Sequence, residues 1–225
     1  MTLRLNKFLA ERLGISRREA DDFIAAGKVF VNDEKATLGA RIEENDKVVF
    51  NKKEVPFETR YIYLAFNKPV GFVCSRKRQG DVPTIYEILP KKYQDLKTVG
   101  RLDKDSSGLI LLTNDGDFAF RMTHPKFSKT KVYEVLIDRK LEPLHQQMIA
   151  DFGIEIGDGV SRLGLTKLNE GRDRWEVLMS EGRNRQIRRT FAALGYKVVE
   201  LERKQFGPYV LDGLKPGEFL ETKKV

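Results

Sequence analysis

Hydrophobic residues recur at helical spacing in two short segments near the start of the chain. The first segment, residues 4–13, predicts a helix that is ended by a glycine. The second follows Ser16, which forms the pattern of a helix-capping box with Glu19 three positions later. Short strands are predicted at residues 29–31 and 46–50, with a turn between them. The chain is therefore expected to begin with a small α+β module.

Strand patterns dominate the rest of the chain, behind a polar, proline-containing stretch that predicts a linker at residues 51–60. Strands are predicted at 61–66, 109–112, 132–137, 163–168 and 175–179, and helices at 84–89, 142–151 and 186–194. Because few strand–helix–strand units occur, we expect a mainly antiparallel mixed sheet with flanking helices. The predicted fold class is α+β, with domains over residues 1–55 and 61–225.

The charge balance adds a class of partner to this picture. Lys and Arg number 41 against 33 Asp and Glu, which gives a net charge of +8 and a pI near 9.4. Such a basic protein favours a polyanionic partner, with nucleic acid as the leading candidate. The sequence shows no long apolar run and no signal-peptide pattern, so we expect a cytoplasmic protein. Cys74 is the single cysteine and no metal-ligand spacing is visible, so we expect no disulfide, metal or cofactor.

The segment at residues 100–117 carries the strongest candidate for chemistry. Arg101 and Asp103 lie two positions apart, on the same side of an extended segment, and a serine-rich turn and a buried strand follow. A carboxylate beside a guanidinium, next to a buried strand, is a way to hold one ionised acid in a partly enclosed site. Two alternatives exist. One is a calcium loop, which lacks its Glu because position twelve is Asn114, and the other is a structural Arg–Asp pair.

A cluster of four arginines within seven positions is the second candidate: Arg183, Arg185, Arg188 and Arg189. We expect a helix to start near residue 184 or 185, so that the last three share a face while the apolar residues between them face the core. Arginines at this density repel one another unless anions lie nearby, and either RNA phosphates or the Asp103 carboxylate would serve. The alternative is an ordinary basic helix surface.

Weaker signals come from a strand and from the N-terminal helices. Alternation along residues 131–137 places Lys131 and Tyr133 on one face, where the Tyr ring could stack on a nucleobase or simply pack in the core. Arg17 and Arg18 lie in the first turn of the second helix, where the helix dipole disfavours positive charge. An anionic ligand such as a phosphate backbone would explain them, and a solvated surface is the alternative.

Four of these segments stand in the order typical of one enzyme family: N-K-P-V-G at 67–71, G-R-L-D at 100–103, K-V-Y at 131–133 and E-G-R-N-R-Q-I-R-R at 181–189. Together they resemble the RsuA/RluB/RluE/RluF family of ribosomal RNA pseudouridine synthases. The pattern of residues 2–50 resembles the RNA-binding αL module named after ribosomal protein S-four. The expected architecture is therefore that module followed by a pseudouridine synthase catalytic domain.

The resemblance implies a role for each candidate residue. It makes Asp103 the catalytic carboxylate, gives it Arg188 as ion-pair partner, and stacks Tyr133 on the target base. Arg101 would fill the space that the flipped base leaves. RNA contacts are implied for the remaining basic residues, which are Lys131, Arg183, Arg185, Arg189, Arg17, Arg18 and Lys28. The reaction would be the cofactor-free isomerisation of a uridine, with ribosomal RNA as partner and a monomer as the active form.

Short segments favour one target over the other. Residues 81–86 with Leu89-Pro90, and the E-G-R-N-R run, look more like the large-subunit RluB branch, which favours 23S over 16S ribosomal RNA. Two rivals from other classes share some of these features. One is a non-catalytic ribosomal RNA-binding or assembly protein, which would share the basic charge and the N-terminal module but would not need an Asp–Arg pair. The other is a metal-dependent nuclease built on Asp103, Asp105, Asp115 and Asp117.

Overall fold

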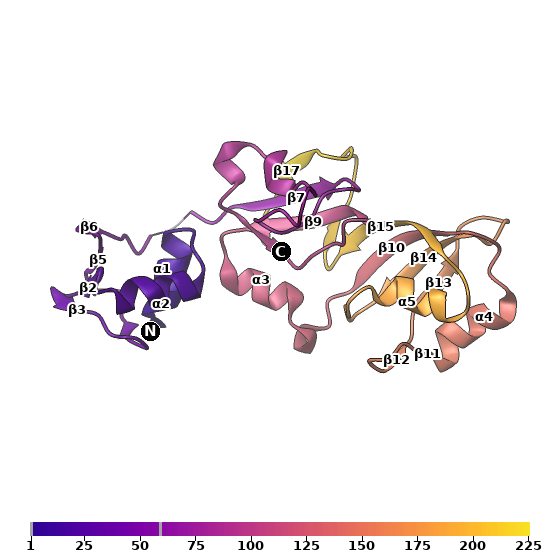
Figure 1. The fold of residues 1–225 in the computed structure, drawn as a ribbon, viewed down its shortest axis with the longest axis horizontal. Helices are drawn as coiled ribbons and strands as arrows, with labels where there is room; N and C mark the ends of the chain where they lie inside the picture. The colour runs from indigo at the N-terminus through magenta and orange to yellow at the C-terminus, as the bar shows by residue number, and fades with distance from the viewer. Residues whose placement is uncertain (1, 59) are drawn as a thin grey trace. The chain divides into compact units, whose positions relative to one another are not determined.

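The computed structural model describes residues 2–58 and 60–225, and the chain separates into two compact units (Figure 1). The small unit comprises Met1–Ile62 with Asn114–Gly116, and the large unit comprises Tyr63–Thr113 with Asp117–Val225. Among the described residues, no helix is long and apolar enough to cross a lipid bilayer. Each unit has its own sheet and its own buried residues, so the two are described in turn.

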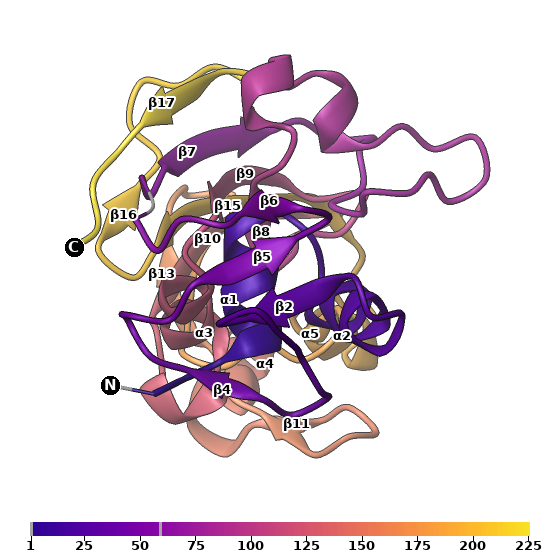
Figure 2. The same ribbon diagram turned by 90° about the vertical axis from the view of Figure 1, so that its left-hand side faces the viewer.

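Two helices and two small antiparallel sheets build the small unit (Figure 2). Its elements are β1 (Leu3–Arg4), α1 (Leu5–Arg12), α2 (Arg17–Ala25), β2 (Val29–Val31), β3 (Glu34–Lys35), β4 (Arg41–Ile42), β5 (Val48–Phe50) and β6 (Lys53–Glu54). The strands pair as β3-β2-β5-β6 and β1-β4. The predicted helices are confirmed, and so is the capping box: Glu19 N donates to Ser16 Oγ at 3.1 Å and Ser16 N donates to Glu19 Oε2 at 2.7 Å.

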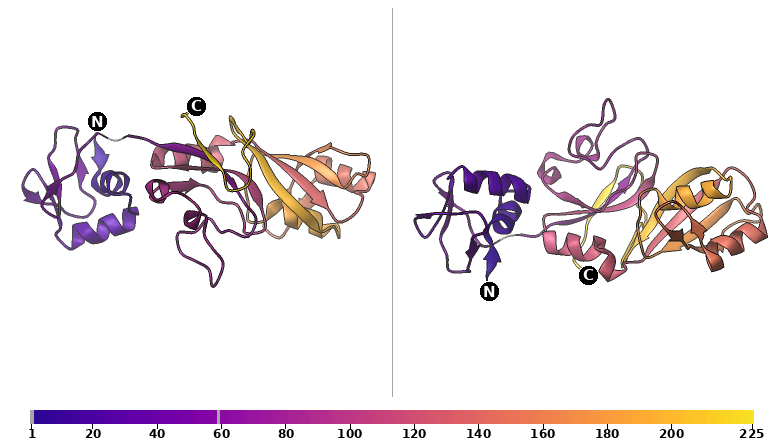
Figure 3. Two further views of the ribbon diagram at one scale, coloured as in Figure 1. Left: turned by 90° about the horizontal axis from the view of Figure 1, so that it is seen from above. Right: turned by 60° about the horizontal axis from the view of Figure 1, so that its bottom comes forward.

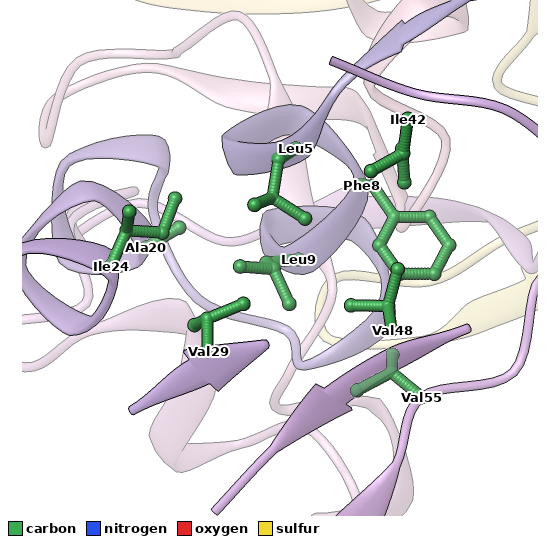
Figure 4. Packing of buried hydrophobic residues seen from close by; sticks show 9 residues of the cluster. All are labelled: Leu5, Phe8, Leu9, Ala20, Ile24, Val29, Ile42, Val48 and Val55. Atoms are coloured by element: carbon green, nitrogen blue, oxygen red, sulfur yellow. The ribbon is translucent and has the colours of Figure 1, made fainter. Parts of the chain in front are cut away.

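Apolar residues from both helices and from the strands close over one another to form the core of the small unit (Figure 4). Leu5, Phe8 and Leu9 of α1 meet Ile24 of α2 and Val48 of β5, and all five are buried. Each such side chain contributes roughly 1.5–3 kcal/mol by leaving water. The helical spacing seen in the sequence is thus the spacing of residues that face this core.

The predicted linker at residues 51–60 is wrong over its first half. Lys53–Glu54 pairs with β5 through a turn at Asn51 and Lys52, whose φ angles of +48° and +66° are those of a tight hairpin. Val55 is buried in the core of the small unit, and Arg12 Nε donates to Pro56 O at 3.2 Å. The polar composition concealed the hairpin because both of its edge residues face solvent.

A mainly antiparallel sheet forms the body of the large unit, as predicted (Figures 1 and 3). Its strands are β7 (Tyr63–Lys68), β8 (Lys97–Val99), β9 (Ser107–Thr113), β10 (Lys131–Ile137), β13 (Gly164–Lys167), β14 (Arg174–Met179), β15 (Val198–Phe206), β16 (Tyr209–Val210) and β17 (Phe219–Glu221). The order is β13-β14-β10-β15-β9-β7-β17, with β16 beside β15 and β8 beside β9. Among the described strands, β9 and β15 form the one parallel pair.

Helices and a small hairpin flank this sheet. They are η1 (Ile85–Glu87), η2 (Lys91–Tyr93), α3 (Gly116–Thr123), η3 (Pro125–Phe127), α4 (Pro143–Gln147), the π-helix η4 (Met148–Phe152), α5 (Gln186–Ala193) and the hairpin β11 (Ile154–Glu155)–β12 (Val160–Ser161). The predicted helix at 142–151 is confirmed as α4 and η4, and that at 84–89 is the shorter η1. Helix α3 was not predicted, because its start reads as a turn. Helix α5 contacts β11 and β15.

The parallel contact between β9 and β15 depends on a glycine. Gly108 pairs with Arg203 and has a φ of +100°, a value that a residue with a side chain rarely adopts. A Cβ atom at this position would lie 2.4 Å from Arg203 O, so the two backbones approach closely only because Gly108 has no side chain. This contact brings the loop that precedes β9 next to the middle of β15.

Candidate active site

A cavity of about 350 Å³ lies in the large unit, where segments far apart in the sequence meet. Its walls come from the loop before β9, the end of α3 with the turn that follows, the start of β10, the loop before α5, and β15. Six basic residues line it against two acidic ones: Arg101, Lys129, Lys131, Arg183, Arg185 and Arg203 against Asp103 and Glu181. This imbalance favours an anionic ligand such as a nucleic acid strand.

Asp103 lies in the loop between β8 and β9 and contributes its carboxylate to the cavity. The side chain keeps 37% of its exposure, so the loop holds the carboxylate in a partly enclosed position that solvent still reaches. Arg185 is its ion-pair partner, with Nη1 3.7 Å from Asp103 Oδ2 and 3.4 Å from Asp105 Oδ2. Asp103 is thus beside a cation yet open to a ligand.

The expected ion pair between Arg188 and Asp103 is wrong. Arg188 Nη1 donates to Val198 O at 2.8 Å, and Nη2 donates to Asp105 O at 2.8 Å. Burial, and then the charge of Arg185, lowers the pKa of Arg188, while the charges of Asp105 and Asp103 oppose this shift. Arg188 therefore holds the backbone of the Asp103 loop against β15, and its charge reaches the carboxylate only through space.

The start of α5 explains why Arg185, and not Arg188, forms the ion pair with Asp103. The helix begins at Gln186, and Arg185 precedes it with a φ of +47°, in the left-handed region. Arg185 is therefore directed away from the helix, and the predicted face shared by Arg185, Arg188 and Arg189 does not exist. The two apolar predictions on this helix are confirmed, since Ile187 and Phe191 are buried.

Arg183 and Arg189 converge on Asp158, in the loop between β11 and β12. Arg189 Nη2 lies 2.8 Å from Asp158 Oδ2, and Arg183 Nη1 lies 3.3 Å from Asp158 Oδ1. The hydrogen bond from Arg189, followed by the charges of both arginines, lowers the pKa of Asp158. Arg183 lines the cavity and Arg189 does not. Asp158 lies in a glycine-rich turn, so no local pattern of the sequence points to this ion-pair cluster.

Three further predicted residues line the cavity. Tyr133 is 8% exposed and lies on β10 opposite Arg203 of β15. Lys131 Nζ donates to the carbonyl oxygens of Lys129 and Glu181, both at 3.2 Å. Burial, and then the charge of Arg203, lowers the pKa of Lys131, with Glu181 opposing. Arg101 is exposed at the rim.

Lys68 supports the Asp103 loop from behind, and we did not select it from the sequence. It is fully buried, and its Nζ donates to Ser106 O at 2.6 Å and to Pro69 O at 2.9 Å. Burial lowers the pKa of Lys68 to about 8, against the opposing charges of Cys74, Asp103 and Asp105. A lysine at the end of an apolar strand and directly before a proline is the signal that could have identified it.

Lys68→Met should remove a pH-dependent part of the stability. The pKa of Lys68 is about 8 in the folded protein against an ordinary value of 10.5, so between these values the unfolded chain binds more protons. The free energy of unfolding should therefore rise from pH 8 to 10.5, by up to about 3 kcal/mol. Urea unfolding across this range should show wild type gaining stability relative to Lys68→Met. A difference that does not change with pH would show that the Lys68 ammonium is solvated.

The predicted RNA-binding residues of the small unit are at its surface. Arg17 and Arg18 are exposed in the first turn of α2, and Lys28 is exposed just before β2. Arg17 Nη2 donates to Asn6 Oδ1 at 3.2 Å, and Lys28 Nζ lies over the Phe23 ring at 5.3 Å. The positive charges are thus held in place by neutral groups and remain available to phosphates.

The acids of the nuclease alternative do not converge. Asp103 and Asp105 precede β9, and Asp117 follows it. A seven-residue strand separates them by roughly 20 Å. Among the described residues, no group of three or more His, Cys, Asp or Glu side chains could hold a metal ion.

Comparison with known proteins agrees with this geometry. A sequence model described as RNA pseudouridylate synthase matches residues 62–193, and one described as S4 domain matches residues 3–48. The ribosomal small subunit pseudouridine synthase A of Pasteurella multocida is 37% identical over 222 residues, covering 96% of this chain and 94% of the relative. The ribosomal large subunit pseudouridine synthase B of Buchnera aphidicola is 34% identical over 236 residues, covering 100% and 95%.

A solved structure shows the same fold along nearly the whole chain. It is described as a crystal structure of pseudouridylate synthase and superposes with a TM-score of 0.70 at 35% identity. The match covers 98% of this chain and 96% of the other. The predicted order, an RNA-binding module followed by a mainly antiparallel α+β domain, is therefore confirmed.

Proposed function

Because this chain belongs to the RsuA/RluB family of RNA pseudouridine synthases, we propose that it isomerises a uridine of ribosomal RNA to pseudouridine with Asp103 as its catalytic carboxylate. One observation carries this proposal. Asp103 is a solvent-accessible acid within a cavity whose charged lining residues are mainly cations, a setting that receives the nucleotide of an RNA strand and places a carboxylate beside it. The target uridine must leave its stack to enter, at a cost of a few kcal/mol.

The residues around Asp103 have separate roles in binding and positioning the target nucleotide. Arg185 supplies the counter-charge that orients the carboxylate. Tyr133, whose ring forms part of the cavity wall, stacks on the target base, and Arg101 at the rim occupies the space that the base vacates. Asp103 then adds to the base, adds to the sugar, or accepts a sugar proton. In all three cases the bond between N1 of the base and the ribose breaks, the base turns, and it rejoins the ribose through carbon.

RNA binding is shared between the two units in this proposal. Residues 1–55 form the RNA-binding domain and residues 61–225 the catalytic domain, with the protein acting as a cytoplasmic monomer. Arg17, Arg18 and Lys28 contact phosphates of the structured substrate, and the cations of the cavity bind the backbone around the target. Arg183 and Arg189 act mainly by fixing the loop before α5 on Asp158.

Replacing Arg17 and Arg18 by Ala should weaken RNA binding without changing turnover at saturating RNA. Each arginine that contacts a phosphate releases about one counter-ion, so the slope of log affinity against log salt should fall by about two. Filter binding across salt concentrations gives this slope. The matched control replaces Lys52 and Lys53, two exposed basic residues of the same unit outside both helices. An equal loss in both double variants would argue against a specific role for α2.

We propose 23S ribosomal RNA as the substrate, on the strength of residues 81–90 and the E-G-R-N-R run. The names of the relatives divide between the small and large ribosomal subunits, so the test must supply both RNAs. Purified protein is incubated with 16S and 23S transcripts, and pseudouridine is mapped by carbodiimide modification and primer extension. A product in 16S alone would correct the target and leave the reaction standing. No product in either RNA, nor in isolated ribosomal subunits, would overturn the proposed function.

A further inference from the structure

Arg203 is a buried cation in the cavity wall whose role the preceding mechanism does not explain. It is 2% exposed and lines the cavity from β15. Its Nε donates to Leu109 O at 2.7 Å, and its guanidinium carbon lies 4.8 Å from the centre of the Phe206 ring. Nη2 is buried and has no hydrogen-bond partner among the described residues, and none of their carboxylates forms an ion pair with Arg203. An unpaired buried guanidinium costs stability, so it calls for a functional explanation.

A second arginine of the same unit shows what a purely structural arrangement looks like. Arg172 also stacks on an aromatic ring, 5.2 Å from the centre of Trp175, and its Nε also donates to a backbone oxygen, Leu141 O at 3.0 Å. Its Nη2, however, donates to Gln146 Oε1 at 2.8 Å. Arg172 lies outside the cavity and its Nη2 is paired, whereas Arg203 lies within the cavity wall and its Nη2 is not. The contrast indicates that the partner of Arg203 is a ligand.

The surroundings of Arg203 define the chemistry of that ligand. Lys131 Nζ lies over the same Phe206 ring at 5.5 Å, so two cations flank one aromatic residue. Tyr133, the proposed stacking partner of the target base, is paired with Arg203 across the strands. A ligand here must offer an oxygen that carries negative charge and must fit beside a flat ring. A uracil carbonyl meets both requirements.

We propose that Arg203 is a further catalytic residue, whose guanidinium binds a carbonyl oxygen of the target uracil and stabilises the negative charge that develops on the ring. This inference rests on the proposed function. When the bond between N1 and the ribose carbon breaks, its electron pair stays with the ring and spreads over N1 and the carbonyl oxygens. Asp103 balances the electron-deficient sugar by adding to it or by taking its proton, and its addition to the base would likewise place charge on the ring. As C5 bonds to the ribose, the bond that Asp103 formed breaks, or Asp103 returns the sugar proton that it took. C5 then loses a proton and N1 gains one, while Arg203 stays protonated throughout.

The experiment measures turnover at saturating ribosomal RNA, RNA affinity and thermal unfolding for Arg203→Met, Arg203→Lys and the matched control Arg172→Met. Removing a donor that faces developing charge typically costs about 100-fold in turnover, so we expect that loss in Arg203→Met with an affinity within about twofold of wild type. Arg203→Lys, which keeps the charge, should recover part of the loss. Added guanidinium ion should partly restore turnover in Arg203→Ala. Arg172→Met should lower the melting temperature and leave turnover unchanged.

Three results would overturn the inference. Weaker RNA binding with a reduced salt slope and normal turnover in Arg203→Met would assign Arg203 to a phosphate instead. Turnover that falls in Arg203→Met and Arg172→Met only in step with the loss of folded protein would make Arg203 structural. Turnover unaffected by either Arg203 substitution would remove it from the reaction. In these three cases the wild-type enzyme is active, whereas an inactive wild type would overturn the proposed function and this inference with it.

Discussion

Asp103→Asn should reduce pseudouridine formation by at least about 1,000-fold, or some 4 kcal/mol of barrier, with little change in fold or RNA affinity. Asn has nearly the same shape but carries no charge, so it can neither add to carbon nor accept a proton. The fold should survive because Arg185 keeps its second partner, Asp105, at 3.4 Å. Single-turnover assays on the RNA that wild type modifies, together with binding and thermal unfolding, measure all three quantities.

Asp105→Asn is the matched control for this prediction. Asp105 lies on the same loop, pairs with the same arginine and is also exposed, but it does not line the cavity. We expect its replacement to reduce turnover by less than about tenfold. Residual activity of Asp103→Asn within tenfold of wild type would refute the assignment of Asp103. An Asp103→Asn protein that binds RNA normally yet forms no product would also separate catalysis from the simple RNA binding of an assembly protein.

Arg185→Met should mainly lower turnover, whereas Arg188→Met should lower stability as well as turnover. Arg185 forms an ion pair with the proposed catalytic carboxylate, so its loss should lower turnover at saturating RNA by about 100-fold, near 3 kcal/mol, while the melting temperature stays within a few degrees of wild type. Arg188 instead holds two backbone oxygens, Val198 O and Asp105 O, and its loss should cost roughly 1–3 kcal/mol of stability. Turnover should fall in Arg188→Met as well, because the Asp103 loop loses its support.

Thermal unfolding and turnover measured on the same preparations separate these two cases. Equal destabilisation by both substitutions would mean that Arg185 is a structural residue like Arg188. Full turnover in Arg185→Met would show that the ion pair seen at 3.7 Å does not serve the reaction. In that event the through-space charge of Arg188 would become the counter-charge of Asp103.

The fold could be predicted from the sequence wherever one local rule decides the structure. The capping box at Ser16 and Glu19 needs only two residues three positions apart, and it forms as predicted. The strand at 109–112 is too apolar for any exposed position, and it lies in the centre of the sheet. Helix α3 was missed because the run 114–117 is typical of a turn, while the evidence for a helix lies four positions apart in Phe118 and Met122.

The candidate site could be predicted only as far as its segments. The sequence pattern predicts that the Asp103 loop and the arginine cluster belong to one site, and both line the same cavity. It could not say which arginine meets the carboxylate, because that depends on a single left-handed φ angle at Arg185. Nor does it show directly that Lys68 and Arg203 are buried, since burial of a charged side chain follows from the packing of strands distant in sequence. Arg203 lies two positions from Leu201, so both side chains point to the same face of β15. This spacing was the clue that Arg203 faces inward.

The parallel contact between β9 and β15 also governs when the protein becomes competent during its synthesis. The hydrogen bond from Arg203 to Leu109 spans 94 positions of the chain, so a long loop must close before this contact can form, at a cost in chain entropy. A nascent chain that has completed β9 still lacks every part of its cavity except the loop that precedes β9. The cavity can therefore close only once β15 has been synthesised, so the chain becomes competent late and all five wall segments become available only near the end of synthesis.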